Sequence, residues 1–396
     1  MKKRKILIVV ESLGCGGAEK SLVSLLPLID YKKFEVDLLI YNRNRGLFEQ
    51  LVDERVHILP NENFQNFCSK PIVKQVLSFN ISYIFARLRW KAAIIFNKKM
   101  KYPKHSSEVY WKSCSKVISP ITNHYDVAIA WGQGHSTHYV AEKVNADKKY
   151  AWINANYVLG NHDKAFDMPF YRVMNRIIVV SEQLLPITQK VFPEFAANMK
   201  VIYDVINADL IFAMSQEYNP FENDKKLHIV TVGRLAPQKG YNLALQACKI
   251  MKEKGIRFIW YALGEGSMRD ELEQYIKEHH LEDNFVLLGV KDNPYVYTGH
   301  ADIYVQTSVF EGYCLTLAEA RILNKPIVTT DFDVVHDQIE HGYNGLIAQM
   351  NPTSIADAII RLATDDDLRN RLSENLKKEK KGNIEEAEKF NQLLSE

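Results

Sequence analysis

Short runs of consecutive apolar residues alternate along the chain with segments whose apolar residues recur at helical spacing. Residues 6–10 form the first run, which is followed by a glycine-bearing loop and a helical pattern over residues 18–29. Residues 34–41, 127–131 and 176–180 are further runs of this kind. Such runs are typical of strands buried in parallel sheets, so the pattern predicts a doubly wound α/β fold.

The same rhythm starts again near Leu227, where a strand pattern precedes a helical pattern over residues 241–254. We therefore expect two Rossmann-like domains, residues 1–205 and residues 206–377, that face a central cleft. Residues 378–396 are charged and helix-prone, and we expect them to form a C-terminal helix that packs back on the first domain.

The 396 residues are 46% apolar and 25% charged, which excludes a disordered chain, a collagen and a small disulfide scaffold. The five cysteines show no close pair spacing, which favours the reducing cytoplasm over disulfides or a structural zinc site. No apolar run approaches the roughly 18 residues of a spanning helix. The run at residues 6–10 is also too short for a signal peptide, so any membrane contact is expected to be peripheral.

Positive charge is concentrated in the first half of the chain. Residues 1–205 carry a net charge of +11, and residues 206–396 carry −9. Residues 69–118 contain eleven Lys and Arg residues and one acid, Glu108. Aromatic residues are interleaved with these cations: Phe79, Tyr83, Phe85, Trp90, Phe96, Tyr102, Tyr110 and Trp111.

An apolar stripe at helical spacing runs through this basic segment, and Arg87, Lys91 and Lys98 lie off it. The stripe consists of Ile81, Ile84, Phe85, Leu88, Ala92 and Ile95. This arrangement is typical of a helix on an anionic lipid surface. Two alternatives are that the stripe faces the protein's own core and that the basic patch binds nucleic acid. We favour the membrane surface and expect no nucleic-acid partner.

Glycines follow the first predicted strand and precede a helix. Gly16 and Gly17 allow backbone amides, at the positive end of that helix, to approach an anion closely. The loop lacks the GxGxxG pattern and no acid ends the second strand in the usual context, which disfavours a nicotinamide cofactor. The alternative role of these glycines is helix packing.

Two cations lie in the loop at residues 233–240, which reads GRLAPQKG and begins with Gly233 after a predicted strand. Arg234 offers a rigid fork of donors and Lys239 a point charge, so together they can hold the two phosphates of a nucleoside diphosphate. The alternative is that both cations are solvated on a surface loop.

Two glutamates bracket a glycine turn in the segment FEGYCLTLAE. Gly312 permits the turn and leaves backbone amides free to receive a phosphate or sugar oxygen, namely those of Tyr313, Cys314 and Leu315. Glu311 and Glu319 can accept hydrogen bonds from vicinal hydroxyls, one pair on a sugar and one on a ribose. The alternative is a capping glutamate and a surface glutamate.

The three loops together resemble glycosyltransferase family 4: the GGAE segment at residues 16–19, the GR…KG segment with Arg234 and Lys239, and the paired glutamates. The resemblance spans most of the chain and is strongest over residues 227–349. It implies the GT-B fold and transfer of a sugar from a nucleotide donor, which we expect to be a UDP-sugar. It also implies retention of anomeric configuration, without a metal or other cofactor.

The resemblance further implies roles for individual residues. Glu319 would hold the donor ribose and Glu311 the hydroxyls of the transferred sugar. Arg234 and Lys239 would hold the pyrophosphate, which the glycines of the first loop would face. The other donor contacts implied are Gly16, Gly17, Gly233, Gly264, Val290, Gly312, Tyr313, Cys314 and Leu315. Cations and helix-end amides can stabilise the leaving diphosphate in place of a metal.

The chain departs from the family at one position. Many relatives have a histidine after a Trp-Ile strand, whereas this chain has Asn154 there. Asn154 can hydrogen-bond a sugar hydroxyl but cannot carry a proton, so we include it in the catalytic set without assigning its role. Three histidines nearby in sequence are candidate substitutes, each with a core or surface position as the alternative: His135, His138 and His162.

The leading hypothesis is a glycosyltransferase at the cytoplasmic face of the plasma membrane. It would move a hexose or N-acetylhexosamine to a lipid-linked or cell-surface glycan such as capsule, O-antigen or teichoic acid. Two alternatives are a catalytically silent GT-B subunit that binds or chaperones a partner, and a nucleotide-sugar epimerase. Incubation with UDP-sugars distinguishes the three through transfer, binding without turnover, or isomerisation.

Overall fold

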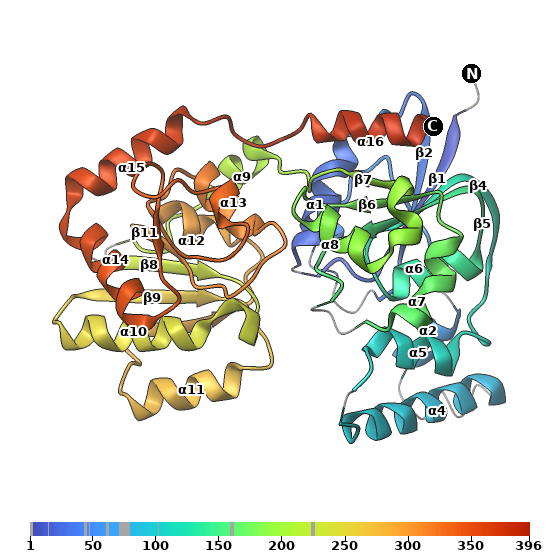
Figure 1. Ribbon diagram of the computed structural model, residues 1–396, viewed down its shortest axis with the longest axis horizontal. Coiled ribbons are helices and arrows are strands. Elements are labelled where there is room, and N and C mark those ends of the chain that lie inside the picture. The colour runs from blue at the N-terminus through green and yellow to red at the C-terminus, as the bar shows by residue number, and fades with distance from the viewer. Residues whose placement is uncertain are drawn as a thin grey trace. The chain divides into compact units, whose positions relative to one another are not determined.

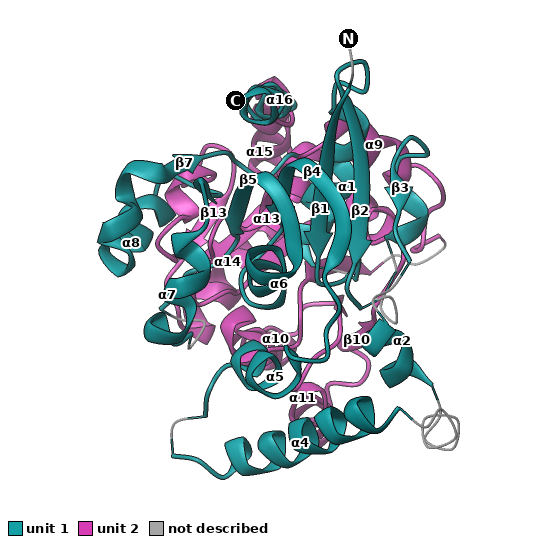
Figure 2. Cartoon of the chain, turned by 90° about the vertical axis from the view of Figure 1, so that its right-hand side faces the viewer, with its two compact units in different colours: residues 1–205, 384–396 teal, residues 206–383 magenta. Residues whose placement is uncertain are grey.

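A computed structural model describes residues 3–14, 16–42, 46, 48–60, 63–70, 80–101, 103–158, 162–222 and 226–396. Two of the aromatic residues named above, Phe79 and Tyr102, lie outside these ranges. The chain folds into two compact units (Figure 2). Unit 1 consists of residues 1–205 and 384–396, and unit 2 consists of residues 206–383.

Unit 1 is built on a seven-stranded parallel sheet with the order β3-β2-β1-β4-β5-β6-β7 (Figure 1). Its strands are β1 (Arg4–Val10), β2 (Phe34–Ile40), β3 (His57–Ile58), β4 (Ile121–Ala130), β5 (Val144–Ile153), β6 (Arg176–Val179) and β7 (Met199–Val201). In the central strand, Ile8 pairs with Leu38 on one side and Ile129 on the other. All five residues of the apolar run at 6–10 are buried, as expected for a strand covered on both faces.

Helices pack around the sheet of unit 1. They are α1 (Gly17–Leu25), α2 (Asn63–Ser69), α4 (Ile81–Lys98), α5 (Ser106–Cys114), α6 (His135–Lys143), α7 (Lys164–Arg172), α8 (Leu184–Val191) and α16 (Glu386–Ser395). The first helix ends at Leu25, four residues before the expected end. Because Pro27 has no amide hydrogen to donate, the chain continues as a 3-10 turn, Leu26–Leu28.

Unit 2 contains a six-stranded parallel sheet with the order β10-β9-β8-β11-β12-β13. Its strands are β8 (Leu227–Val232), β9 (Phe258–Leu263), β10 (Phe285–Gly289), β11 (Ile303–Gln306), β12 (Ile327–Thr330) and β13 (Leu346–Ala348). Its helices are α9 (Ala208–Ser215), α10 (Tyr241–Glu253), α11 (Arg269–Glu278), α12 (Tyr295–His300), α13 (Leu315–Ile322), α14 (Pro352–Thr364) and α15 (Asp366–Lys378). The first strand, β8, pairs with β9 on one side and with β11 on the other. The strand order therefore reverses between β8 and β11, which form the switch point of the sheet.

The last residues of the chain belong to unit 1, and the return occurs at residue 384, not at the expected residue 378. Residues 379–383 stay in unit 2 because their side chains are bound there: Glu379 pairs with Arg321, and Asn383 accepts a hydrogen bond from the Ile206 amide. Helix α16 then packs in unit 1, where Phe390 is fully buried beside Trp131 and Trp152.

Helix α4 has two apolar faces. One face packs on unit 1: Ala86 is buried, and the Trp90 ring lies 5.0 Å from the Tyr110 ring at nearly a right angle. The opposite face is exposed and consists of Ile81, Phe85, Leu88, Ile95 and Phe96, which are 59–77% exposed. The alternative that the whole stripe faces the core is therefore wrong for its members Ile81, Phe85, Leu88 and Ile95, although Ile84 does pack against the core. In the described part of the chain, no helix is both long and apolar enough to cross a bilayer.

Candidate active site

The loop after β8 carries the two predicted cations. Gly240, which closes the loop, has a φ of 65°, and a Cβ there would overlap the carbonyl oxygen of Thr307. The hydroxyl of Thr307 donates to the Lys239 carbonyl at 2.9 Å, and the Val309 amide donates to the Gln238 carbonyl at 2.8 Å. Glycine at position 240 therefore lets the loop after β8 lie directly against the loop after β11.

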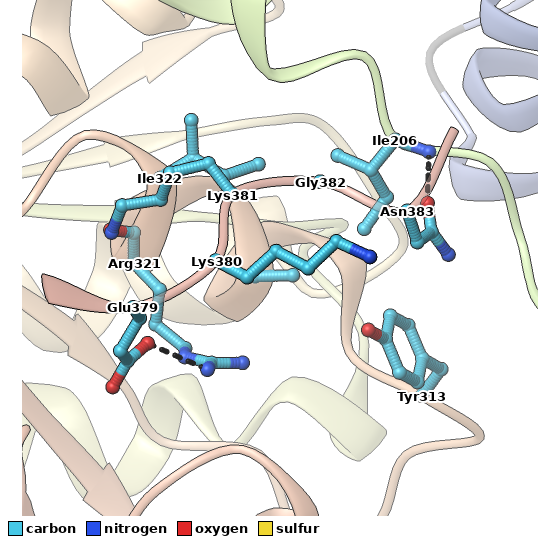
Figure 3. A pocket seen from close by; sticks show the side chains of 10 residues that line it. Ile206, Tyr313, Arg321, Ile322, Glu379, Lys380, Lys381, Gly382 and Asn383 are labelled. Atoms are coloured by element: carbon cyan, nitrogen blue, oxygen red, sulfur yellow. Dashed lines mark hydrogen bonds and ion pairs between the residues drawn. The ribbon is translucent and has the colours of Figure 1, made fainter. Parts of the chain in front are cut away.

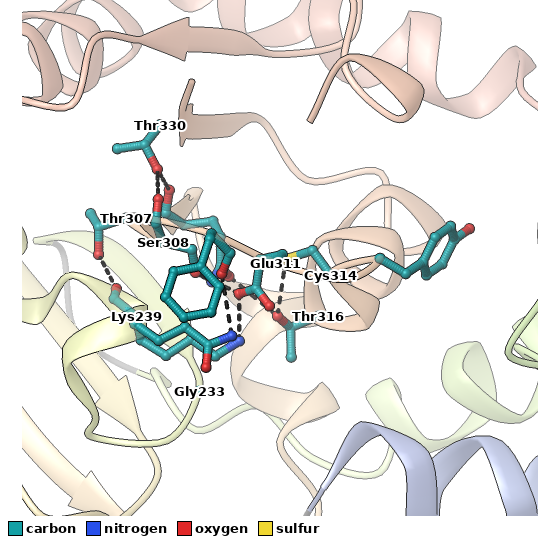
Figure 4. Close-up of polar contacts among 12 residues, drawn as sticks. Gly233, Lys239, Thr307, Ser308, Glu311, Cys314, Thr316 and Thr330 are labelled. Carbon is teal, nitrogen blue, oxygen red and sulfur yellow. Dashed lines mark hydrogen bonds and ion pairs between the residues drawn. The ribbon is translucent and has the colours of Figure 1, made fainter. Parts of the chain in front are cut away.

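Lys239 and Glu311 form a nearly buried ion pair between these two loops. The Lys239 Nζ lies 2.6 Å from Glu311 Oε1, and the side chains are 14% and 7% exposed. The Ser308 hydroxyl donates to the same carboxylate oxygen at 2.6 Å (Figure 4). The sequence assigned these two side chains to different parts of a donor, and the structure joins them in one pair. Ser308 was not predicted, although it lies only two residues after the end of β11.

Arg234 differs from Lys239 in its surroundings. Its side chain is exposed and makes no hydrogen bond or ion pair with any of the residues that the structure describes. Because its guanidinium is not neutralised, it can receive an anionic ligand with both edges of its fork. The loop therefore presents one free cation beside one paired cation.

The glycine turn leads into α13 as the sequence predicts. Cys314 precedes the helix in a left-handed conformation, with a φ of 65°, and burial raises the pKa of its thiol. The first amides of an α-helix have no acceptor within the helix, so this turn can offer donors to an anion. The carbonyl of Tyr313 accepts a hydrogen bond from the side chain of Gln338, which the sequence analysis did not identify.

Glu319 lies inside α13 and is 4% exposed. The hydroxyl of Tyr295 donates to its Oε1 atom at 3.2 Å. The alternative of a surface glutamate is therefore wrong. A buried carboxylate that accepts a hydrogen bond is suited to accept further ones from hydroxyl groups of a ligand.

Two further loops at the carboxyl edge of this sheet pack against the Gly233 loop. A Cβ on Gly264 would overlap the Gly233 carbonyl oxygen, and the Gly264 amide donates to the Gly289 carbonyl at 2.9 Å. Val290 follows at once and is 39% exposed. The loops after β8, β9, β10 and β11 thus meet at one edge of the sheet, where doubly wound folds bind ligands.

In unit 1, Gly16 caps the first turn of α1 and Gly17 begins the helix. The side chain of Glu19 folds back to this end, since a Cβ on Gly16 would overlap its carboxylate. A carboxylate therefore already lies at the positive end of the helix. An anion could approach Gly16 and Gly17 only once the Glu19 side chain had moved away from this end of the helix.

Asn154 directly follows β5, and only some of its polar groups have hydrogen-bond partners among the described residues. Its backbone N–H donates to the Gln133 side-chain oxygen at 3.2 Å, but its side-chain Oδ1 is buried and accepts no hydrogen bond from any described residue. A buried acceptor without a donor is costly, so a side-chain rotation that brings Oδ1 to a ligand hydroxyl would relieve that cost.

The three candidate histidines have different surroundings. His138 is fully buried and lies 2.8 Å from Asp167, which also accepts a hydrogen bond from Tyr157 at 2.6 Å. His162 lies 3.5 Å from the same carboxylate, and its ring stacks on His105 with centroids 4.0 Å apart. Burial opposes ionisation of Asp167, but hydrogen bonds from these neighbours outweigh it and lower its pKa.

His135 differs from the other two, because its Nδ1 lies 3.2 Å from Glu11 at the end of β1. His138, which is fully buried, is a core residue, in agreement with the alternative of a core position. His105 and Asp167 were not predicted from the sequence, because no spacing rule links them to these histidines. No three His, Cys, Asp or Glu side chains among the described residues form a group suited to a metal ion.

Comparisons with known proteins give a family match for part of the chain and relatives over most of it. Residues 215–379 match the family model for glycosyl transferases group 1. The N-acetylgalactosamine-N,N'-diacetylbacillosaminyl-diphospho-undecaprenol 4-alpha-N-acetylgalactosaminyltransferase of Campylobacter jejuni is 25% identical over 377 residues, 92% of each chain. The poly(ribitol-phosphate) alpha-N-acetylglucosaminyltransferase of Staphylococcus aureus is 31% identical over 139 residues, 34% of this chain and 28% of that one.

A solved structure supports the fold over the whole length. The Anabaena protein Alr3699/HepE, in complex with UDP and glucose, matches with a TM-score of 0.71 and 17% identity, covering 99% of each chain. Both parallel-sheet units are therefore those of the GT-B fold. Residues 215–379, most of unit 2, match the family of glycosyl transferases group 1, and the comparisons support a glycosyltransferase.

Proposed function

We propose that this chain is a glycosyltransferase that moves a hexose or N-acetylhexosamine from a UDP-sugar to a lipid-linked or cell-surface glycan, with retention of configuration and without a metal. The observation that carries the proposal is that Arg234, which has no ion-pair partner among the described residues, lies in the same loop as Lys239, whose ammonium group pairs with Glu311 at the switch point of the unit 2 sheet. At this edge, neighbouring loops carry cations that can bind a diphosphate and carboxylates that can bind the hydroxyl groups of a sugar.

Charge development explains why these residues suit a leaving nucleoside diphosphate. As the bond between sugar and phosphate breaks, negative charge grows on the phosphate oxygens. Arg234, Lys239 and the first amides of α13 stabilise that charge more in the transition state than in the ground state. Lys239 then shares its charge between Glu311 and the phosphate, while Glu311 remains a hydrogen-bond acceptor for the sugar.

A retaining reaction needs no protein nucleophile under this proposal. The departing phosphate accepts the acceptor's proton on the same face of the sugar, so that the new bond forms where the old bond broke. The C. jejuni relative is named as a 4-alpha transferase, and an alpha product from an alpha-linked donor requires retention. Asn154 Oδ1 is proposed to accept a hydrogen bond from the transferred sugar.

The remaining donor contacts follow the loop arrangement. Glu319 is proposed to bind the ribose hydroxyls, and the loops at Gly264 and Val290 are proposed to flank the base. Gly312, Tyr313, Cys314 and Leu315 are proposed to bind the sugar and phosphate through backbone amides. Gly16 and Gly17 are proposed to contact the diphosphate once Glu19 has moved away.

A kinetic assay with a panel of nucleotide sugars tests the proposal. We expect transfer or slow hydrolysis of one UDP-sugar that persists in excess EDTA, with an unchanged anomeric configuration in the product by NMR. Lys239→Met should lower turnover strongly, whereas Lys254→Met, at the exposed end of α10, should not. Binding without turnover would support the silent-subunit alternative, and isomerisation without an acceptor would support an epimerase.

We also propose that α4 rests on an anionic membrane at the cytoplasmic face, which places the enzyme beside a lipid-linked acceptor. The exposed apolar face of α4 has Lys91 and Lys98 exposed beside it, and neither lysine pairs with an acid among the described residues. Arg87 and Arg89 instead donate to backbone carbonyls of Cys68 and Lys112. The free cations and apolar side chains suit anionic headgroups and acyl chains respectively.

Vesicle flotation tests this surface. The variant Phe85→Ser/Leu88→Ser/Phe96→Ser should bind vesicles containing anionic lipid at least about tenfold more weakly, since each buried side chain contributes about 1.5–3 kcal/mol. Phe212→Ser, which removes a 55% exposed phenylalanine from α9, is the matched control. Equal binding by both variants would rule out α4 as the membrane contact. Trp90 is unsuitable for this test because it packs on Tyr110.

A further inference from the structure

The glycine turn of the candidate site, residues 311–315, accepts hydrogen bonds from a buried glutamine, Gln338. Gln338 is 3% exposed, and its side-chain amide donates to the Tyr313 carbonyl and, at 3.5 Å, to the Cys314 carbonyl. Both carbonyls lie immediately before α13. The position of this turn is therefore coupled to that of Gln338.

Asn344 extends the contact away from the turn. It is 5% exposed, and its amide nitrogen donates to the Gln338 carbonyl at 3.0 Å and to Glu379 Oε1 at 2.7 Å. Its Oδ1 accepts from the Glu340 amide at 2.8 Å. Both amide hydrogens of Asn344 are thus used, so this side chain has one satisfied orientation.

Glu379 closes the path back to α13. Its Oε2 lies 2.7 Å from the Arg321 guanidinium, in the last turn of that helix. Lys381 donates to the carbonyls of Arg321 at 2.7 Å and of Leu376 at 2.6 Å, which are at the C-terminal ends of α13 and α15. Burial lowers the pKa of Lys381 to about 8. Both ends of α13 are therefore attached to the segment that ends unit 2.

That segment lies beside the segment where unit 2 begins (Figure 3). The Ile206 amide donates to Asn383 Oδ1 at 2.8 Å. Gly382 has a φ of 69°, and a Cβ there would lie 2.6 Å from the Ile206 carbonyl oxygen. A cavity of about 60 Å³ lies between α13 and these two segments and is lined by Tyr313, Arg321 and Lys380, among other residues.

We propose that Gln338, Asn344, Glu379 and Arg321 are positioning residues that fix the turn at residues 311–315. They would couple the binding of a ligand at this turn to Ile206 and Asn383, the first and last residues of unit 2. The proposal rests on the proposed function, because it takes the ligand of the turn to be the nucleotide donor. A donor bound at the turn holds the Tyr313 and Cys314 carbonyls in place. The buried contacts through Gln338, Asn344 and Glu379 then restrict the Arg321 side chain and the segment at residues 379–383.

Amide hydrogen exchange measured with and without saturating UDP tests this coupling. In the native protein we expect UDP to slow exchange of the Ile206 amide at least threefold. Glu379→Gln replaces an acceptor that faces Arg321 with a donor and should abolish that UDP-induced slowing. Its KM for the donor should rise at least threefold, while the protein stays folded.

A matched control and a conservative variant keep the test decisive. Asp357→Asn breaks the exposed pair with Lys254 in the same unit and should leave the effect of UDP unchanged. Arg321→Lys keeps a charged partner for Glu379 and should retain part of the slowing. If Glu379→Gln does not fold, the slowing in Arg321→Lys is compared with that in Asp357→Asn instead. The same UDP effect in Glu379→Gln as in Asp357→Asn would overturn the inference alone. A native protein that binds no UDP or UDP-sugar would overturn the proposed function, and the inference with it.

Discussion

The ammonium group of Lys239 lies 2.6 Å from a carboxylate oxygen of Glu311, across two loops that are 72 positions apart in the chain. Because both side chains are nearly buried, neither charge is well solvated without the other. The pair therefore holds a cation that is already desolvated at the carboxyl edge of the sheet. Under the proposed function, a diphosphate would share this cation without the cost of removing water from it.

Removing Lys239 should affect activity and stability in separable ways. Lys239→Met is expected to lower kcat by about 10² to 10³, the scale of a lost charged contact to a developing oxyanion. It should also lower the free energy of unfolding by about 3 kcal/mol, because Glu311 is left buried without its partner. Steady-state kinetics and urea unfolding measure the two effects.

The double variant Lys239→Met/Glu311→Gln is the control for this experiment. It removes the unpaired charge, so stability should return towards that of the native protein while kcat stays low. Recovery of kcat together with stability would mean that Lys239 has no role in the chemistry.

The ribose assignment of Glu319 can be tested with deoxy analogues of the donor. The native enzyme should bind the 2′-deoxy or the 3′-deoxy form of UDP about tenfold more weakly than UDP, since a lost hydrogen bond to a charged group costs about 1.5–3 kcal/mol. Glu319→Gln should reduce this discrimination. Tyr295→Phe, which removes the hydroxyl 3.2 Å from Glu319, should keep it. Isothermal titration gives the affinities, and undiminished discrimination in Glu319→Gln would refute the assignment.

The histidine cluster of unit 1 predicts a loss of stability in mild acid. Burial, followed by the nearby His162 and His135, lowers the pKa of His105 to about 4 from 6.5. Between these values the unfolded chain binds a proton that the folded protein does not, so the free energy of unfolding falls as the pH drops. After allowance for partial exposure, the contribution is about 1–2 kcal/mol.

His105→Asn should flatten the pH dependence of urea unfolding between pH 6.5 and pH 4. Asparagine can replace the ring nitrogen that accepts a hydrogen bond from the Ser107 amide at the start of α5, so the helix cap is preserved. His124→Asn, at a position where the ring is 53% exposed, is the control. A pH profile in His105→Asn identical to that of the native protein would contradict the prediction.

The C-terminal helix should contribute strongly to the stability of unit 1. Phe390 is completely buried. The centroid of its ring lies 6.2 Å from that of the Trp131 ring and 5.7 Å from that of the Trp152 ring. Phe390→Ala should lower the free energy of unfolding by about 3–5 kcal/mol through lost contacts and a cavity. Gln392→Ala, at an exposed position on the same helix, should change it by less than about 0.5 kcal/mol. Denaturant unfolding followed by tryptophan fluorescence measures both.

Much of the candidate site could be predicted because glycines, charges and strand ends are local features. Gly233, Arg234 and Lys239 follow β8, and the Glu311 turn follows β11, as the pattern indicates. Ser308, Gln338 and Asn344 could not be assigned in this way. Their roles depend on which loops become neighbours when parallel strands pair, and no periodicity reports that pairing.

The sequence by itself determined the alternation of strands and helices, the two-domain organisation and the residue types at the strand ends, because these depend on spacing within short segments. Only the tertiary structure decided that Lys239 pairs with Glu311 and that Trp90 packs inward while Phe85 lies exposed on the same helix. It alone also assigned Glu379 to unit 2. The physical reason is that burial and ion pairing are set by contacts between distant segments, whose approach is fixed by the register and crossover order of the two sheets.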